Sequence, residues 1–409
     1  MIIKSNKSVK MNIAIITPAS LPATQFGGIM FLGLNIAKIL SKQNHKATIY
    51  TTDMDFANNA HTFNRLLPRI EVTEKFIIKR SHVWFSIYLF FINPGMFKQL
   101  SNDKNDIIHS IGVRSFQSLI AAIISKYKKI PLILSDQGGL TTHPDLVSAT
   151  FKKRLLLKLQ KPLIQYIINQ ASRIIVPNEY EKNIFLNFCD ISKISIIKNG
   201  IDLDEVNDSE DDFNKKFLVT NNFILFLGRF HTVKGIHYLI NSINEIKENA
   251  LISKVSVILM GVDFGFQTEM ENLIKQFGLG DMIKIIVNPS REEVISAYKK
   301  CLFLVLPSLW ELSPLTPLEA FAHRKTVIST TAHGIPSTII HNENCILVPP
   351  SNSKELGIAI LDLLANPEKR ELLGENGYKF VTNVANSQIM VNDFFKIYEY
   401  CLNVDNKSS

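Results

Sequence analysis

A chain of 409 residues is too long for one ordinary hydrophobic core and indicates two domains of about 200 residues each. A hydrophobic content of 46% is typical of a well-packed soluble protein. Four widely separated cysteines without a CxxC or CxxH pair argue against a zinc site or a disulfide framework and for a reducing cytoplasm. Residues 1–200 carry 26 Lys and Arg against 11 Asp and Glu, whereas residues 201–409 carry 19 against 26, so we expect the halves to meet different partners.

The first half alternates short apolar runs with amphipathic segments. A polar, basic leader at 1–10 is expected to be disordered, and no signal peptide is visible. The first helix is predicted at Ile29–Leu40, and the strands at Asn12–Thr17, Ala47–Thr51, Asp106–His109, Pro131–Ser135 and Arg173–Val176. Strands that alternate with helices are typical of βαβ units and a parallel sheet.

A polar, acidic stretch at 206–222 is predicted to link an N-terminal domain at 11–205 to a C-terminal domain at 223–385. After it the alternation restarts. The predicted strands are Phe223–Leu227, Lys254–Met260, Lys284–Val287 and Phe303–Leu306, and the predicted helices are Gly235–Glu248, Thr268–Gln276, Arg291–Lys299, Thr316–Ala322 and Lys354–Ala365. The predicted class is α/β, with two doubly wound Rossmann-like domains that face a cleft. A last helix within 386–409 is long enough to cross back to the first domain.

The segment Glu311–Glu319 (ELSPLTPLE) directly follows a buried strand. Its prolines exclude a continuous helix, and Thr316 is expected to cap a helix that begins at Pro317, with Glu319 in a capping box. Glu319 then acts either as a cap partner alone or as a ligand for ribose hydroxyls, and Glu311 can bind sugar hydroxyls in the same way. The start of such a helix also suits a pyrophosphate.

The segment Gly228–Gly235 (GRFHTVKG) also lies between a strand and a helix. Arg229 and Lys234 place two cations where a nucleoside diphosphate leaving group would gain negative charge, although the segment alone fits two surface cations equally well. Gly27 and Gly28 precede the first predicted helix. They do not form the GxGxxG fingerprint of a dinucleotide site, but their backbone can approach a phosphate.

Together these motifs resemble those of GT-B glycosyltransferases of family 4, and the likeness runs from Met11 to about Val381. The matches are Glu311 and Glu319 with the family's E-x7-E motif, Gly228-Arg229 and Lys234-Gly235 with GR…KG, Gly27–Ile29 with GGI, Asn199–Asp202 with NGxD, and Gly334–Pro336 with GIP. Each motif alone is weak, but the ordered set is specific.

The resemblance implies retaining transfer from a UDP-sugar or GDP-sugar, without a cofactor or a required metal. Arg229 and Lys234 would hold the diphosphate, Glu319 the ribose and Glu311 the donor sugar. The donor would also contact Ser313, Pro314, Leu315 and Thr316, with Gly27 and Gly28 near the phosphates from the opposite domain. In this family the acceptor is usually described as attacking the sugar on the same face from which the leaving group departs. The leaving phosphate helps to deprotonate the acceptor.

Three positions depart from this pattern or compete with it. Gln137 stands where many members have a histidine, and it can bind a sugar hydroxyl or the acceptor but cannot shuttle a proton at neutral pH. Arg324 replaces a common glycine, which predicts about 1 kcal/mol of strain if its backbone is left-handed. Asp53-Met-Asp55 matches the DxD motif of metal-dependent GT-A transferases, but nothing else supports that fold, and no metal is expected.

Two segments of the basic half suggest contact with a membrane surface. Lys152–Lys161 resembles a basic amphipathic helix, and the apolar run Val83–Ile92 is rich in aromatic residues but has only about half the length of a membrane span. The alternative is a buried helix at 83–92 and a solvated face at 152–161. Nucleic acid is not an expected partner, because the basic residues lack an interleaved stacking platform.

The sequence therefore predicts a cytoplasmic glycosyltransferase, peripheral on the inner face of the plasma membrane. It would move a hexose or N-acetylhexosamine to a lipid-linked or cell-surface glycan in polysaccharide biosynthesis. Two other classes stay open: a GT-B enzyme of another reaction type, such as an epimerase or phosphorylase, and a non-catalytic relative that binds sugar nucleotides or membranes. The presence of Arg229, Lys234, Glu311 and Glu319 argues against the last.

Overall fold

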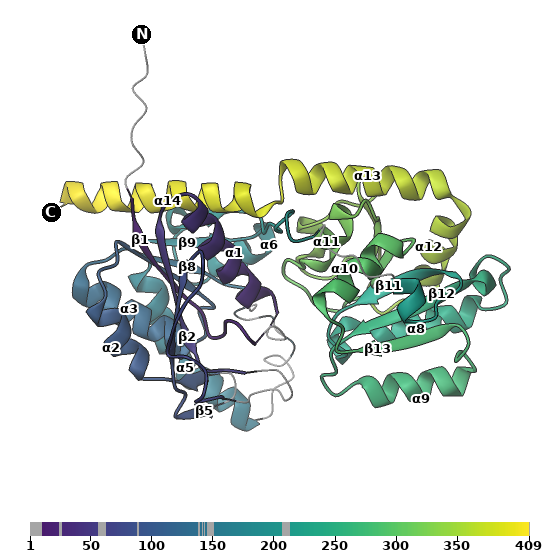
Figure 1. Cartoon of the computed structure of the whole chain (residues 1–409), viewed down its shortest axis with the longest axis horizontal. Coiled ribbons are helices and arrows are strands. Elements are labelled where there is room, and N and C mark those ends of the chain that lie inside the picture. Colours follow the sequence, from purple (N-terminus) through teal and green to yellow (C-terminus); the bar gives the residue numbers. More distant parts are fainter. Residues whose placement is uncertain are drawn as a thin grey trace, which may run out of the picture. The chain divides into compact units, whose positions relative to one another are not determined.

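The computed structural model describes residues 10–23, 27–55, 63–87, 90–137, 140, 142, 144, 151–206 and 213–408. The chain divides into two compact units (Figure 1). The N-terminal unit comprises 1–177, 181–197 and 390–409, and the C-terminal unit comprises 178–180 and 198–389. Most of the predicted leader and residues 207–212 of the predicted linker lie outside the described residues. The rest of that linker contains α7 (Phe213–Lys216), and Phe213 is buried in the core of the C-terminal unit.

The N-terminal unit is built on an eight-stranded sheet that is parallel except for its edge strand β3. In spatial order the strands are β10 (Ile194–Ile196), β9 (Arg173–Val176), β8 (Leu132–Ser135), β7 (Ile107–Ile111), β1 (Asn12–Ile16), β2 (Lys46–Thr52), β4 (Ile77–Ser81) and β3 (Ile70–Val72). The five strands predicted in this half are confirmed, with small shifts at their ends. Of the unpredicted strands in this sheet, β3 and β10 are the two edge strands, and β4 lies next to β3.

Helices cover both faces of this sheet. One face carries α1 (Gly28–Lys42) and the crossing helix α14 (Ser387–Ser408), whose Met390, Phe394 and Tyr398 are buried in the same core as α1. The other face carries α2 (Gly95–Asn102), α3 (Phe116–Lys128) and α5 (Phe151–Gln170) (Figure 1). A short α6 (Glu179–Phe185) follows β9. The prediction that the last helix returns to the first domain is confirmed.

The apolar run Val83–Ile92 does not form a helix. It forms the antiparallel strands β5 (Phe85–Ile87) and β6 (Phe90–Ile92), and its Tyr88 and Leu89 lie outside the described residues. All three residues of β5 are exposed, whereas Phe91 of β6 is buried. The buried-helix alternative is therefore wrong, because the described residues of this run form two paired strands, one of which is exposed.

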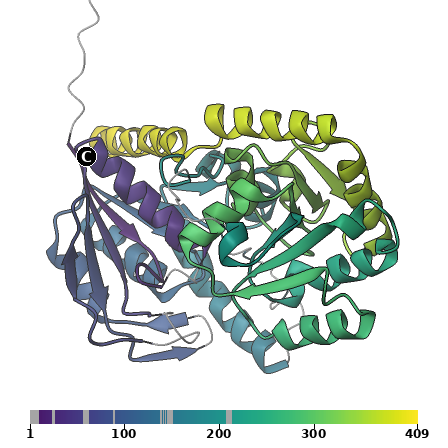
Figure 2. The same cartoon turned by 45° about the vertical axis from the view of Figure 1, so that its right-hand side comes forward.

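The C-terminal unit contains a six-stranded sheet in which every described strand pair is parallel. In spatial order the strands are β13 (Ile283–Val287), β12 (Val255–Gly261), β11 (Asn222–Leu227), β14 (Leu304–Leu306), β15 (Val327–Thr330) and β16 (Cys345–Val348). The helices are α8 (Ile236–Ile246), α9 (Gln267–Phe277), α10 (Arg291–Lys300), α11 (Thr316–Ala322), α12 (Ser353–Ala365) and α13 (Pro367–Asn383). The strands with helices on both sides can be followed in Figure 2.

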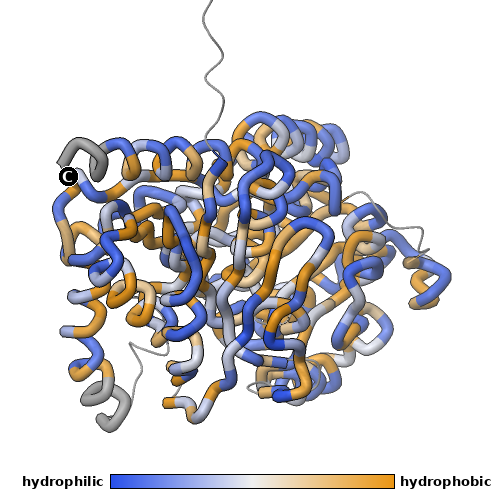
Figure 3. Tube along the Cα trace, turned by 60° about the vertical axis from the view of Figure 1, so that its left-hand side comes forward, coloured by the Kyte–Doolittle hydropathy of each residue, from blue (hydrophilic) through white to orange (hydrophobic). Residues whose placement is uncertain are grey.

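Alternate residues of the central strand β11 enter two separate cores. Ile224 and Phe226 pack with residues of α8, α9 and α12, whereas Phe223 and Leu225 pack with residues of α10 and α11. A strand buried on both faces reads as a continuous apolar run, which is why FILFL was identifiable from the sequence. Along the outer helices, hydrophobic and hydrophilic residues alternate (Figure 3), as helices with one buried face require.

The crossing helix α14 is anchored to its sheet by a buried polar chain. The Tyr398 hydroxyl lies 2.6 Å from Nδ1 of His109 in β7, and Nε2 of His109 lies 2.8 Å from the Ser135 hydroxyl of β8. Burial lowers the pKa of the His109 imidazole to about 3.

Among the described residues, no helix has both the length and the apolar content that a membrane span needs.

The buried His109 predicts acid sensitivity. As pH falls, the unfolded chain protonates this imidazole near pH 6.5, whereas the folded protein does so only near pH 3, so the folded state loses stability between those values. For one such histidine the loss at about pH 5 is about 2 kcal/mol relative to neutral pH. The variant His109→Gln should therefore be less stable than the wild type at neutral pH, with the gap narrowed by about 2 kcal/mol at about pH 5. Urea unfolding at both pH values measures the gap, and an equal gap at both would contradict the prediction.

Candidate active site

Two loops at the carboxyl edge of the C-terminal sheet carry most of the predicted site residues. The loop after β11 holds Arg229 and Lys234, and the loop after the adjacent strand β14 runs through Glu311 to the start of α11. Ligands of doubly wound sheets bind outside the carboxyl ends of the strands. Sequence and sheet order therefore bring these residues to the edge where a ligand is expected.

A glycine contact fixes the two loops against each other. The single turn η3 (Thr232–Lys234) ends at Gly235, which has a φ of 66°, and a Cβ there would overlap the carbonyl oxygen of Pro307. One turn away, the Leu309 amide donates to the Val233 carbonyl at 2.8 Å. The KG pair of the motif is thus needed for close approach as well as for its charge.

Lys234 and Glu311 form an ion pair across these loops. The Lys234 ammonium bonds Oε1 of Glu311, and the Ser308 hydroxyl lies 3.0 Å from the same oxygen. The side chains of Lys234 and Glu311 are only 15% and 11% exposed. Because both charges are largely withdrawn from water, each depends on the other for compensation.

Glu319 is not a helix cap, so the capping-box prediction is wrong. Helix α11 spans Thr316–Ala322, the predicted range, but Thr316 is its first residue and not its cap, and the N-cap residue Leu315 makes no side-chain cap bond. Glu319 instead pairs with Nη1 of Arg291 at 2.8 Å, and its second oxygen accepts from the Tyr298 hydroxyl at 3.1 Å. Burial, followed by the Glu319 charge, raises the pKa of Tyr298 well above its ordinary value, so this hydroxyl stays a donor.

Arg229 is placed by an aromatic ring. Its guanidinium carbon lies 5.2 Å from the centroid of Phe264, in the loop after β12. Gly228 belongs to a tight crossing, because a Cβ on Gly261 would overlap the Gly228 carbonyl oxygen. Arg229 and Lys234 share one loop, and the described interactions include no direct bond between them.

Ser313, Pro314 and Leu315 lie in the loop that leads to Thr316, the first residue of α11, and residues of other segments hold this loop in place. The Asn178 amide donates to the Leu312 carbonyl at 2.7 Å, and the Gly334 amide donates to the Glu311 carbonyl at 2.9 Å. A Cβ on Gly334 would overlap the Leu312 carbonyl, which explains the glycine of the GIP stretch. Asn199 of the NGxD turn lies 3.5 Å from the Ser313 carbonyl.

The remaining predicted site residues belong to the N-terminal unit. Gly27 has a φ of 88° and is the N-cap of α1, which begins at Gly28, while Gln137 follows β8. Both glycines and Gln137 therefore lie after carboxyl ends of β1 and β8. They stay predictions as binding residues.

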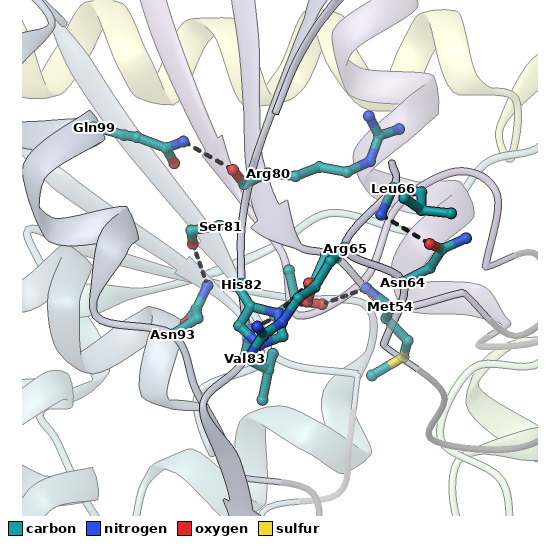
Figure 4. A network of polar contacts seen from close by, with 12 residues as sticks. Met54, Asn64, Arg65, Leu66, Arg80, Ser81, His82, Val83, Asn93 and Gln99 are labelled. Atoms are coloured by element: carbon teal, nitrogen blue, oxygen red, sulfur yellow. Dashed lines mark hydrogen bonds and ion pairs between the residues drawn. The ribbon is translucent and has the colours of Figure 1, made fainter. Parts of the chain in front are cut away.

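The Asp53-Met-Asp55 motif serves local contacts at the end of β2. Figure 4 shows Met54 of the motif with Arg65, His82 and Val83 close by. Asp53 bonds Nδ1 of His82 and accepts from the Val83 amide at 3.1 Å, and Arg65 donates to the other ring nitrogen of His82 at 2.8 Å. Asp55 accepts from Asn64 at 2.9 Å. The two carboxylates are therefore engaged with different protein groups.

Several residues at the site were not predicted from the sequence. They are Phe264, Arg291, Tyr298 and Ser308, which contact the predicted residues directly. Ser308 could have been found, since it follows the Pro307 that ends the apolar run. Arg291 and Tyr298 have no motif, because their role depends on how α10 packs beside α11.

Comparison with known proteins identifies the class. Residues 208–380 match the family described as glycosyl transferases group 1, and residues 26–205 match glycosyltransferase family 4. An uncharacterized glycosyltransferase of Methanocaldococcus jannaschii is 30% identical over 69% of this chain and 72% of its own length. The capsular polysaccharide biosynthesis glycosyltransferase CapM of Staphylococcus aureus is 26% identical over 74% of this chain and 87% of its own.

A solved structure shares the fold. The crystal structure of Anabaena HepE in complex with UDP and glucose superposes with a TM-score of 0.74 at 19% identity, covering 95% of this chain and 99% of that one. The fold is thus that of the GT-B glycosyltransferases. The chain belongs to the group 1, family 4 glycosyltransferases, enzymes that transfer a sugar from a nucleotide sugar.

The contact of Gly235 with Pro307 predicts a specific cost for an added methyl group. Gly235→Ala should lower the free energy of unfolding by about 2 kcal/mol more than Gly278→Ala, and it should also lower transferase activity. Gly278 is a matched control, because it has the same φ of 66° but no atom within 4 Å of an added Cβ. Urea unfolding measures both variants. Equal costs for the two would show that the loops do not depend on this contact.

Proposed function

We propose that the protein is a retaining, metal-independent glycosyltransferase that acts on a lipid-linked or cell-surface glycan. The donor is a UDP-linked or GDP-linked hexose or N-acetylhexosamine. The observation that carries the proposal is the ion pair of Lys234 with Glu311, two mostly buried side chains at the carboxyl edge of the sheet. The Lys234 ammonium has three donor hydrogens, so it can bind a diphosphate while it stays paired with Glu311.

Each predicted residue has a role that its surroundings support. Lys234 and Arg229 neutralise the charge that develops on the diphosphate as the bond to the sugar breaks. Glu311 accepts hydrogen bonds from sugar hydroxyls, as does Glu319 from the ribose. The backbone of Ser313–Thr316 borders sugar and phosphate, and its carbonyl neighbours are already engaged by Asn178 and Gly334. In the N-terminal unit, Gly27 and Gly28 offer backbone to the phosphates and Gln137 offers a hydrogen bond to the acceptor.

The transfer balances without a protein nucleophile. The bond from the anomeric carbon to the phosphate oxygen breaks, the bond to the acceptor oxygen forms on the same face, and the acceptor proton passes to the departing phosphate. The residues bind, orient and neutralise charge, which is consistent with a glutamine at position 137. The capsular polysaccharide role in the name of the Staphylococcus aureus relative supports a surface glycan as the product.

The function is tested by mixing the protein with UDP-sugars and GDP-sugars in the presence of EDTA and measuring release of the nucleotide. We expect slow hydrolysis of one donor, unaffected by EDTA, with the anomeric configuration retained in the product. Lys234→Ala should lower turnover by about a hundredfold or more, since it removes one preorganised charge.

Lys369→Ala is the matched control for this variant. Lys369 lies in α13 of the same unit and also pairs with a carboxylate, that of Asp362, at 2.7 Å. A change below about threefold in Lys234→Ala would contradict the phosphate role. Tight nucleotide binding without turnover of any donor would favour a non-catalytic relative, and loss of activity in EDTA would contradict metal independence.

We also propose that the N-terminal unit attaches peripherally to the anionic inner face of the plasma membrane. In β5 and just before it, Trp84, Phe85 and Ile87 are 69%, 54% and 42% exposed. On the paired strand β6, Phe90 packs on Phe116 of α3, whereas the apolar side chains of β5 lie at the surface. The described part of α5 adds exposed Lys158, Leu159, Lys161 and Leu163, while the side chains of 151–156 lie outside the described residues. Exposed aromatic and basic side chains together suit an anionic interface.

Sedimentation with vesicles of anionic lipid, at low and at high salt, tests the attachment. The wild type should co-sediment at low salt and less at high salt. The double variant Trp84→Ser, Phe85→Ser should lose about tenfold or more in binding, because two aromatic side chains no longer enter the interface. Leu372→Ser, at an exposed position of α13, is the control and should bind like the wild type. Failure of the wild type to co-sediment at low salt would exclude this attachment.

A further inference from the structure

Helix α10 presents two side chains to the carboxylate of Glu319. Arg291 is its first residue and Tyr298 lies seven residues later, so both are on one face of the helix. The start of the helix is fixed by a capping box, in which Ser290 accepts from the Glu293 amide at 3.2 Å and Glu293 accepts from the Ser290 amide at 2.6 Å. Arg291 therefore projects from a well-anchored turn.

Each oxygen of the Glu319 carboxylate faces a donor group, although the single hydrogen of the Tyr298 hydroxyl is shared with the Thr316 carbonyl, 3.2 Å away. Arg291 donates to Oε1 at 2.8 Å, and Tyr298 lies 3.1 Å from Oε2. Tyr298 is only 1% exposed and stacks on His323, with ring centroids 5.5 Å apart and an interplanar angle of 16°. The terminal torsion of a glutamate side chain is otherwise broad, so two donors on opposite oxygens set the plane of the carboxylate.

The two donors leave acceptor capacity for a ligand. A carboxylate oxygen has two lone-pair positions, and each oxygen of Glu319 has one protein donor among these contacts. The Glu319 side chain is 20% exposed, so part of it remains accessible. A ribose presents two adjacent hydroxyl donors, one for each oxygen.

We propose that Arg291 and Tyr298 are positioning residues that orient the Glu319 carboxylate for the two vicinal hydroxyls of a ribose. The enzyme then selects ribonucleotide donors over 2′-deoxyribonucleotide donors through this clamp. The proposal rests on the proposed function, since it assigns Glu319 to the ribose of the donor.

The test compares the binding of ribonucleotide and 2′-deoxyribonucleotide. Calorimetric titration of the wild type with UDP, GDP and ADP identifies the preferred base, and the 2′-deoxy form of that nucleotide is then titrated. The wild type should bind the ribonucleotide about tenfold or more tightly than its deoxy form, the expected effect of one hydrogen bond to a charged group. In Arg291→Ala and in Tyr298→Phe this ratio should fall to about threefold or less.

The ratio of the two affinities separates a positioning role from structural damage, because damage weakens the binding of both nucleotides alike. Arg324→Ala is the matched control: Arg324 pairs with Glu375 at 3.1 Å in the same unit and should leave the ratio unchanged. An unchanged ratio in both α10 variants would overturn the clamp while leaving the glycosyltransferase intact. If the wild type bound none of the three nucleotides, the proposed function would fail first.

Discussion

The contact between Lys234 and Glu311 joins the loop after β11 to the loop after β14, and the arrangement of the site depends on it. Two charges that are largely withdrawn from water persist only when they compensate each other with good geometry. Gly235 allows that geometry by letting its turn lie directly on Pro307. The Thr330 hydroxyl of β15 donates to the carbonyl of Ser308, the residue after Pro307, at 2.6 Å. The loops are thus ordered before any donor arrives.

The charges of the site come in compensated pairs. Lys234 forms an ion pair with Glu311, and Arg291 forms one with Glu319. The Arg229 guanidinium makes a cation–π contact with Phe264. A diphosphate would therefore meet donors whose positions are already set, so little reorganisation is needed when negative charge grows on it. Asn178 and Gly334 have no proposed contact with the substrates, but their hydrogen bonds fix the loop backbone and so help to keep these donors in place.

The sequence predicted elements whose apolar pattern is strong, and it failed where contacts between distant segments determine the role of a residue. Most of the buried strands and α10, α12 and α14 were found because their apolar positions form clear patterns, but the buried strands β15 and β16 and the helix α13 were not predicted. Arg324 does have a left-handed backbone, with a φ of 55°. The predicted role of Glu319 as a cap partner was wrong, because its carboxylate binds Arg291 and Tyr298, which lie on another helix. The strands β5 and β6 were missed because a short apolar run does not distinguish strand from helix. The E-x7-E and GR…KG motifs indicated which loops matter, but not their pairing.

Helix α14 makes the N-terminal unit discontinuous along the chain. Met390, Phe394 and Tyr398 complete a core whose other members include residues of β1 and α1, nearly the whole chain earlier. A ribosome therefore releases the first sheet long before the helix that covers one of its faces exists. Until then an apolar surface stays open to water, where it invites aggregation. Cotranslational folding of this unit consequently requires either a chaperone on that face or a delay until the end of synthesis, and a fragment ending before α14 would be poorly soluble.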